Sequence, residues 1–160
     1  MELLRELLPG PVTVVLRRTP ALNPELNPGT DLVGLRVPAH PFVRQVARQC
    51  CAAAEPSPLA LTSANKSNET SAIRVQEFAE LWPRLAHVFD GGHLYSSGGD
   101  GDGQQGSTKA DASEGATWRS GSTVVDLSHD RRYRIIRAGC ALEATVRVLE
   151  DKYGFSALEA

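Results

Sequence analysis

Short apolar runs rich in β-branched residues alternate with amphipathic segments along this chain, and this alternation constrains its fold most strongly. The pattern is typical of strands separated by helices, which assemble into an α/β sheet with helices packed on it. Each run is bounded by Pro, Gly, Asn or Asp, as strands commonly are. The expected strands are residues 12–17, 32–37, 58–62, 86–90, 122–127 and 133–137.

Helices are expected in most of the intervals between these strands. Residues 41–53 and 72–82 repeat apolar side chains at helical spacing, which predicts helices packed on a sheet, with their aromatic and cysteine residues in the core. Residues 141–153 predict a final helix that closes the core and ends near Gly154, a suitable C-terminal cap. Residues 2–8 predict a helix without an N-terminal capping residue, so it reads as the end of a longer helix.

Composition favours one globular domain. The chain has 160 residues, of which 41% are hydrophobic and 22% charged, with a net charge of −2. This balance excludes wholesale disorder and a polybasic surface for non-specific nucleic-acid binding. Three cysteines, two of them adjacent, form no disulfide framework or zinc motif, which predicts a reducing compartment and no metal site. No apolar run reaches the roughly 20 residues of a membrane span, and no secretory signal pattern is present.

The stretch from Pro58 to Asn65 is the strongest candidate binding segment. Its apolar run stops in small and polar residues, including Thr62, Ser63 and Asn65. In open α/β sheets, ligands bind beyond the carboxyl ends of strands, so these side chains are placed where chemistry is expected. The alternative is a turn capped by a hydroxyl or an amide.

Charged and hydroxyl residues recur at other strand ends. Arg36 lies within the apolar run 32–40, where a cation needs either a carboxylate of this chain or an anionic ligand. Ser122 precedes one expected strand and Arg137 ends another. Several strand ends therefore offer convergent polar groups.

Between Gly91 and Gly121 the composition shifts to Gly, Ser, Asp, Gln and Thr. This predicts a flexible insertion at 91–121, which would be a lid, an extension or a disordered tract. It lacks the G-x-x-x-x-G-K-[ST] order of a phosphate-binding loop.

An ordered series of motifs resembles the YrdC-like family of threonylcarbamoyl-adenylate synthases. The matching segments are Pro9-Gly-Pro-Val-Thr13, Gly34-Leu-Arg-Val-Pro-Ala-His40, Pro58-Leu-Ala-Leu-Thr-Ser-Ala-Asn65, Phe89-Asp-Gly-Gly92, Gly121-Ser-Thr-Val-Val-Asp126 and Ile136-Arg-Ala-Gly139. The resemblance implies a twisted mixed sheet flanked by helices, with residues 1–160 forming part of a YrdC-like domain. Within the matching segments, Thr13, His40 and Asp90 are expected to be structural.

The resemblance implies that L-threonine, bicarbonate and ATP are joined as threonylcarbamoyl-AMP, with release of pyrophosphate, for the threonylcarbamoyladenosine modification of tRNA. Matching positions imply a threonine site and an ATP site. The threonine site comprises Arg36, Leu61 through its carbonyl, and Ser122; the ATP site comprises Ser63, Asn65, Ser71 and Arg137. Ser71 is equally suited to capping the helix that follows. Mg²⁺ is expected with ATP, held mainly by phosphate oxygens and water, and no protein ligand is assigned to it.

The chain departs from the family in one respect. Family members carry a Lys-x-Arg motif upstream of the Pro-Gly-Pro turn, and no such triplet occurs here, which predicts truncation at the N-terminus. The alternatives to a synthase are a non-catalytic product that binds nucleotide, RNA or a partner protein, and a fragment that does not fold stably. The implied partners are tRNA or double-stranded RNA and a downstream threonylcarbamoyl transferase complex. The expected location is cytoplasmic, or mitochondrial if a transit peptide precedes this segment.

Overall fold

The computed structural model describes residues 2–51, 58–65, 71–92 and 120–158. These residues belong to two compact units, Met1–Leu61 with Gly121–Ala160, and Thr62–Ser120. The first unit contains the sheet and the core, and the second contains the 3₁₀ helix η1 (Val75–Arg84). Most of the predicted insertion at 91–121 lies outside the described residues.

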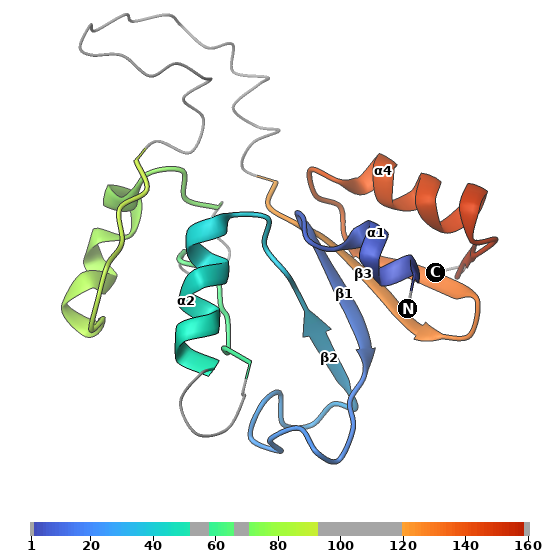
Figure 1. The fold of residues 1–160 in the computed structure, drawn as a ribbon, viewed down its shortest axis with the longest axis horizontal. Coiled ribbons are helices and arrows are strands. Elements are labelled where there is room, and N and C mark those ends of the chain that lie inside the picture. Colours follow the sequence, from blue (N-terminus) through green and yellow to red (C-terminus); the bar gives the residue numbers. More distant parts are fainter. Residues whose placement is uncertain (1, 52–57, 66–70, 93–119, 159–160) are drawn as a thin grey trace, which may run out of the picture. The chain divides into compact units, whose positions relative to one another are not determined.

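The first unit is built on a mixed sheet (Figure 1). Its strands are β1 (Val12–Arg17), β2 (Leu32–Leu35), β3 (Thr123–His129), β4 (Arg132–Arg137) and β5 (Ser156–Ala157), in the order β2-β1-β3-β4-β5. β1 runs parallel to β3 and antiparallel to β2, and β4 runs antiparallel to β3. This confirms the predicted α/β class and its mixed sheet, while the short strand β5 was not predicted.

One face of the sheet is covered by helices from both ends of the chain. α1 (Glu2–Leu7), α4 (Leu142–Arg147) and the π-helical turn η2 (Val148–Lys152) lie over it (Figure 1). Leu7 and Leu149 pack with Val14, Val125 and Tyr133 in the core. The predicted final helix therefore does close the core. Its last turn, η2, ends at Lys152, two residues before Gly154, whose φ of +64° suits a glycine cap.

The two ends of the chain are also joined by a polar clamp. Glu6 accepts a hydrogen bond from the Tyr153 hydroxyl at 2.7 Å and pairs with the Lys152 ammonium at 2.6 Å. The Lys152 and Tyr153 hydrogen bonds lower the pKa of Glu6, and the bond to the Glu6 carboxylate raises the pKa of Tyr153 to about 12. Helix α1 is thereby held at the end of η2.

Two predicted strands are wrong. Residues 58–62 and 86–90 do not form strands, and neither segment joins the described sheet. A β-branched or apolar run becomes a strand only when a neighbouring chain supplies its ladder of hydrogen bonds. The apolar run at 58–62 is visible in the sequence, but the sequence does not show whether another strand pairs with it.

The predicted burial of the helix at 41–53 is also wrong. The helix forms as α2 (Pro41–Cys51), but it buries none of its residues, and Phe42 and Val43 are 44% and 41% exposed. Helical spacing identifies an apolar face, whereas burial needs a second element laid against it. The helix predicted at 72–82 is instead η1, with Phe78 outside helical geometry and Pro83 inside the helix.

Candidate anion-binding site at one edge of the sheet

Ser122 and Arg137 meet where β3 begins and β4 ends. The Nε and Nη2 atoms of Arg137 donate to the Ser122 carbonyl oxygen at 3.0 and 2.7 Å, and Nη2 also donates to the Ser122 hydroxyl at 2.9 Å. Arg137 pairs with Val124 in the antiparallel ladder, so its side chain can reach back to the start of β3. Sequence reasoning assigned these two residues to different substrates, and the structure brings them into contact.

Thr13 is the third member of this cluster. Its Oγ1 lies 3.2 Å from the Ser122 Oγ. The contact arises because β1 and β3 are parallel and begin together, with the Thr123 amide donating to the Pro11 carbonyl at 3.0 Å. Sequence reasoning gave Thr13 a structural role. Its place just after the Pro-Gly-Pro turn, at the start of a strand, was the available signal.

The turn after β4 fits closely against Ser122. A Cβ atom on Gly139 would lie 2.3 Å from the Ser122 carbonyl carbon and the Thr123 nitrogen. The Cys140 amide donates to the Gly121 carbonyl at 3.0 Å, and the Ala141 amide to the Thr123 hydroxyl at 3.2 Å. Only glycine fits at position 139 without displacing the backbone that carries Ser122.

Arg36 lies at the same edge of the sheet. It follows β2 by one residue, and the last residue of β2, Leu35, pairs with Val14. Its side chain is exposed and makes no hydrogen bond or ion pair within the described ranges. The sequence left two alternatives for this arginine, a carboxylate of this chain or an anionic ligand. The described residues contain no salt bridge to Arg36.

The polar groups at this edge come from both kinds of strand end. Arg36 and Arg137 stand at the carboxyl ends of β2 and β4, and Thr13 and Ser122 stand at the amino ends of β1 and β3. The antiparallel neighbours in this mixed sheet bring both kinds of end to one edge. We call Thr13, Arg36, Ser122 and Arg137 the edge cluster.

The remaining predicted site residues are Leu61, Ser63, Asn65 and Ser71. Leu61 is 75% exposed in a segment outside the sheet. Ser63, Asn65 and Ser71 belong to the second compact unit, so their position with respect to Ser122 stays a prediction. The Asp90 carboxylate accepts a hydrogen bond from the Gly92 amide at 2.8 Å, which agrees with its expected structural role.

A buried ion pair lies further along β3. Asp126 has no exposed surface, accepts a hydrogen bond from the Ser128 amide at 2.8 Å, and pairs with Arg134 at 3.2 Å. Burial opposes ionisation of Asp126, but the bonds from Ser128 and Arg134 outweigh it, so its pKa is lowered. Both partners of Asp126 come from its own hairpin, which favours a structural role for this carboxylate.

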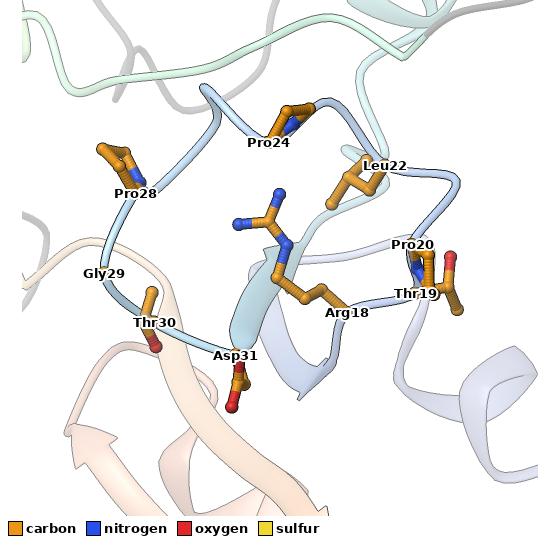
Figure 2. Close-up of a pocket in the computed structure, with 9 residues that line it drawn as sticks. All are labelled: Arg18, Thr19, Pro20, Leu22, Pro24, Pro28, Gly29, Thr30 and Asp31. Atoms are coloured by element: carbon orange, nitrogen blue, oxygen red, sulfur yellow. The ribbon is translucent and has the colours of Figure 1, made fainter.

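A separate cavity lies in the loop that joins β1 to β2, at the end of these strands away from Ser122 (Figure 2). It has a volume of about 490 Å³. The guanidinium of Arg18 points into the loop and donates to the carbonyl oxygens of Asn23, Leu26 and Asn27 at 2.7, 2.7 and 3.3 Å. These bonds explain how the proline-rich loop keeps its shape. None of the predicted site residues lines this cavity.

No helix in the described ranges is long and apolar enough to cross a membrane. Nor do the described residues include three His, Cys, Asp or Glu side chains grouped so that they could hold a metal ion.

The fold is that of an α/β protein whose mixed sheet brings Thr13, Ser122 and Arg137 into contact at one edge, where Arg36 also lies. Residues 1–102 match the family model Sua5_yciO_yrdC, which is described as "Telomere recombination". The chain therefore belongs to the Sua5/YciO/YrdC family.

Curated relatives and solved structures agree with this membership. The chain is 47% identical to human threonylcarbamoyl-AMP synthase over 152 residues, 95% of this chain and 47% of that protein. A Bacillus subtilis (strain 168) protein of the same name is 33% identical over 92 residues, 56% of this chain and 25% of that protein. The chain thus spans about half the length of the mammalian relatives it matches.

The fold is shared with two structures of Sua5 from P. abyssi. A variant of that protein superposes with a TM-score of 0.68 at 23% identity, covering 98% of this chain and 39% of the other. The complex of P. abyssi Sua5 with L-threonine gives a TM-score of 0.69 at 21% identity, covering 98% of this chain and 38% of the other.

Proposed function

We propose that this chain contributes to an L-threonylcarbamoyladenylate synthase, which joins L-threonine, bicarbonate and ATP and acts in the modification of tRNA. The observation that carries the proposal is the edge cluster, in which Ser122 and Arg137 are bonded and Arg36 stands exposed at the same edge of the sheet. Curated relatives named threonylcarbamoyl-AMP synthase support it.

In the proposed reaction, the amine of threonine takes up bicarbonate to form a carbamate, with loss of water. The carbamate oxygen then attacks the α-phosphorus of ATP, and pyrophosphate leaves. The reactants are anionic, so positioning and charge stabilisation would supply most of the rate enhancement. Mg²⁺ would enter with ATP, coordinated by phosphate oxygens and water.

Three residues of the edge cluster, Arg36, Ser122 and Arg137, have a substrate-binding role in this proposal. The Arg36 guanidinium would bind the threonine carboxylate, since a planar fork of donors matches a carboxylate in a bidentate manner. Ser122 would contact the same substrate. Arg137 would bind ATP through Nη1, because the hydrogen bonds to Ser122 use only its Nε and Nη2 atoms. Leu61, Ser63, Asn65 and Ser71 complete the proposed threonine and ATP sites.

Pyrophosphate release tests this proposal. The purified chain is incubated with ATP, Mg²⁺ and bicarbonate, with and without L-threonine. Threonine-dependent release supports the synthase assignment. Absence of release, with activity restored when the chain is joined to a segment carrying a Lys-x-Arg motif, would show that the chain supplies only part of the site. Absence of release in both cases would contradict the proposal.

A non-catalytic binding function is the second candidate, because the sequence contains no Lys-x-Arg triplet. Such a protein would bind nucleotide, RNA or a partner such as the downstream threonylcarbamoyl transferase complex. RNA binding that weakens with salt, without nucleotide turnover, would favour this candidate. In either case the proposed location is the cytoplasm, with mitochondria as the alternative.

A further inference from the structure

The hydroxyl of Ser122 is surrounded by polar groups from two other strands. Ser122 is only 5% exposed, its Oγ accepts a hydrogen bond from Arg137, and it lies 3.2 Å from the Thr13 Oγ1. Thr13 and Ser122 are 109 residues apart in sequence. Their contact therefore depends on the pairing of β1 with β3.

The chemistry of these groups limits the direction of each hydrogen bond. A hydroxyl has one proton to donate and two lone pairs that accept. Arg137 can only donate, so one lone pair of the Ser122 oxygen is occupied. If Thr13 donates to Ser122, the second lone pair is occupied as well, and the Ser122 proton is available for a ligand. If Ser122 donates instead, the Thr13 proton has no other acceptor in the described part of the chain.

A ligand oxygen that accepts a hydrogen bond from Ser122 favours one of the two directions of the Thr13–Ser122 hydrogen bond. When Thr13 donates to Ser122 and Ser122 donates to the ligand, both of these hydroxyl protons have an acceptor. With the opposite direction, the Thr13 proton has no acceptor among the described residues and the ligand oxygen receives no hydrogen bond from Ser122. Only the first arrangement gives the carboxylate a charge-assisted hydrogen bond from Ser122, so a bound carboxylate favours it.

We propose that Thr13 is a positioning residue which, together with Arg137, orients the Ser122 hydroxyl as a hydrogen-bond donor to the carboxylate of the amino-acid substrate. This inference rests on the proposed function, and it adds a role for Thr13 and a direction for the bond that Ser122 makes. Arg36 lies one residue past the Leu35–Val14 pair, at the same edge of the sheet, and would supply the positive charge for this carboxylate.

The backbone around Thr13 suits this role. Thr13 lies in a strand paired on both sides, by β2 and by β3, so its main chain has little freedom. A Cβ atom on Gly34 would lie 3.3 Å from the Thr13 methyl group, so a residue larger than glycine there would crowd it. A β-branched side chain has few χ1 rotamers, which helps to keep the Thr13 hydroxyl aimed at Ser122.

Thr13→Val tests the inference, because valine keeps the shape of threonine and removes the hydroxyl. Isothermal titration of the chain with L-threonine, and separately with ATP, measures both affinities. We expect the Kd for L-threonine to rise roughly tenfold and the Kd for ATP to change by less than about twofold, as for the loss of one neutral hydrogen bond. Thr13→Ser should restore most of the lost affinity.

Thr145→Val is the matched control, since it makes the same chemical change at a buried hydroxyl that has no partner among the described residues. It should leave the L-threonine affinity unchanged. A double-mutant cycle separates positioning from general structure: in a Ser122→Ala background, Thr13→Val should have no further effect on threonine binding. If Thr13→Val does not fold, Thr13→Ala serves in the same comparisons.

Four outcomes would overturn the inference. Unchanged threonine affinity in Thr13→Val would remove the positioning role. Equal losses of threonine and ATP affinity, or an additive effect in the Ser122→Ala background, would indicate general disruption of the site. If the unaltered chain does not bind L-threonine, the titrations are repeated on the chain joined to a segment carrying a Lys-x-Arg motif; absence of threonine binding there as well would contradict the proposed function, and this inference would fall with it.

Discussion

The Arg137 guanidinium binds both the backbone and the side chain of Ser122: its Nη2 donates to the Ser122 carbonyl oxygen at 2.7 Å and to the Ser122 hydroxyl at 2.9 Å. The arginine proposed for ATP is thus bonded to the serine proposed for threonine. Displacement of Arg137 would disturb Ser122, so the two substrate sites are expected to influence each other.

Arg36→Ala should weaken the use of threonine far more than the use of ATP. Arg36 is exposed and makes no ion pair in the described ranges, so its removal should cost little stability. Loss of a charged hydrogen-bonding partner for a carboxylate corresponds to roughly a 10- to 100-fold rise in KM for threonine. Steady-state pyrophosphate release, varied in each substrate, measures both KM values.

The control for this prediction is Arg48→Ala, which removes an exposed arginine from α2. It should leave both KM values unchanged. Equal increases in KM for threonine and for ATP in Arg36→Ala would refute the carboxylate-binding role.

Gly139→Ala should destabilise the first unit and disturb the edge cluster. The added Cβ would lie 2.3 Å from backbone atoms of Ser122 and Thr123, and backbone cannot move aside as a flexible side chain can. We expect a loss of roughly 1–3 kcal/mol in the free energy of unfolding, as for other overpacked sites. Denaturant unfolding followed by circular dichroism measures it. Gly91→Ala is the control, since its Cβ would meet nothing within 4 Å, and equal losses in both variants would contradict this account.

Thr145→Val should stabilise the protein. The Thr145 hydroxyl is buried in α4 and has no hydrogen-bond partner among the described residues, while valine fills the same space without a polar atom. A gain of about 1 kcal/mol would raise Tm by about 2–4 °C in a protein of this size. A lower Tm in thermal unfolding would show that the hydroxyl is satisfied in solution, for example by water.

Asp126→Asn should reduce the loss of stability in acid. Because the folded pKa of Asp126 lies below its unfolded value of 3.8, its carboxylate contributes stability that is present above that value and is lost as pH falls through the folded pKa. The unaltered chain should therefore lose stability as pH decreases below about 4, and Asp126→Asn should lose less. Urea unfolding at a series of pH values tests this. Asp130→Asn, at an exposed position, is the control, and an identical acid dependence in all three proteins would contradict the prediction.

The sequence by itself determined the class of fold and many of its elements. The β-branched run at 12–17 forms β1 over the same residues, the runs at 122–127 and 133–137 form β3 and β4, and α1 and α2 lie within predicted helices. These predictions hold because strand and helix periodicity are local properties of neighbouring residues. The same local signals failed at 58–62 and 86–90, where pairing with a distant strand was required and is not found in the described sheet.

The edge cluster was decided by tertiary structure. The sequence singled out Arg36, Ser122 and Arg137 as polar residues at strand ends, but it assigned Thr13 only a structural role. The parallel pairing of β1 with β3 places Thr13 beside Ser122, which is 109 residues away in the sequence. The antiparallel pairing of β4 with β3 brings Arg137 to the carbonyl and hydroxyl oxygens of Ser122. Such contacts depend on which strands become neighbours, and that choice follows from burying Val14, Val125 and Leu149 in one core rather than from any local pattern.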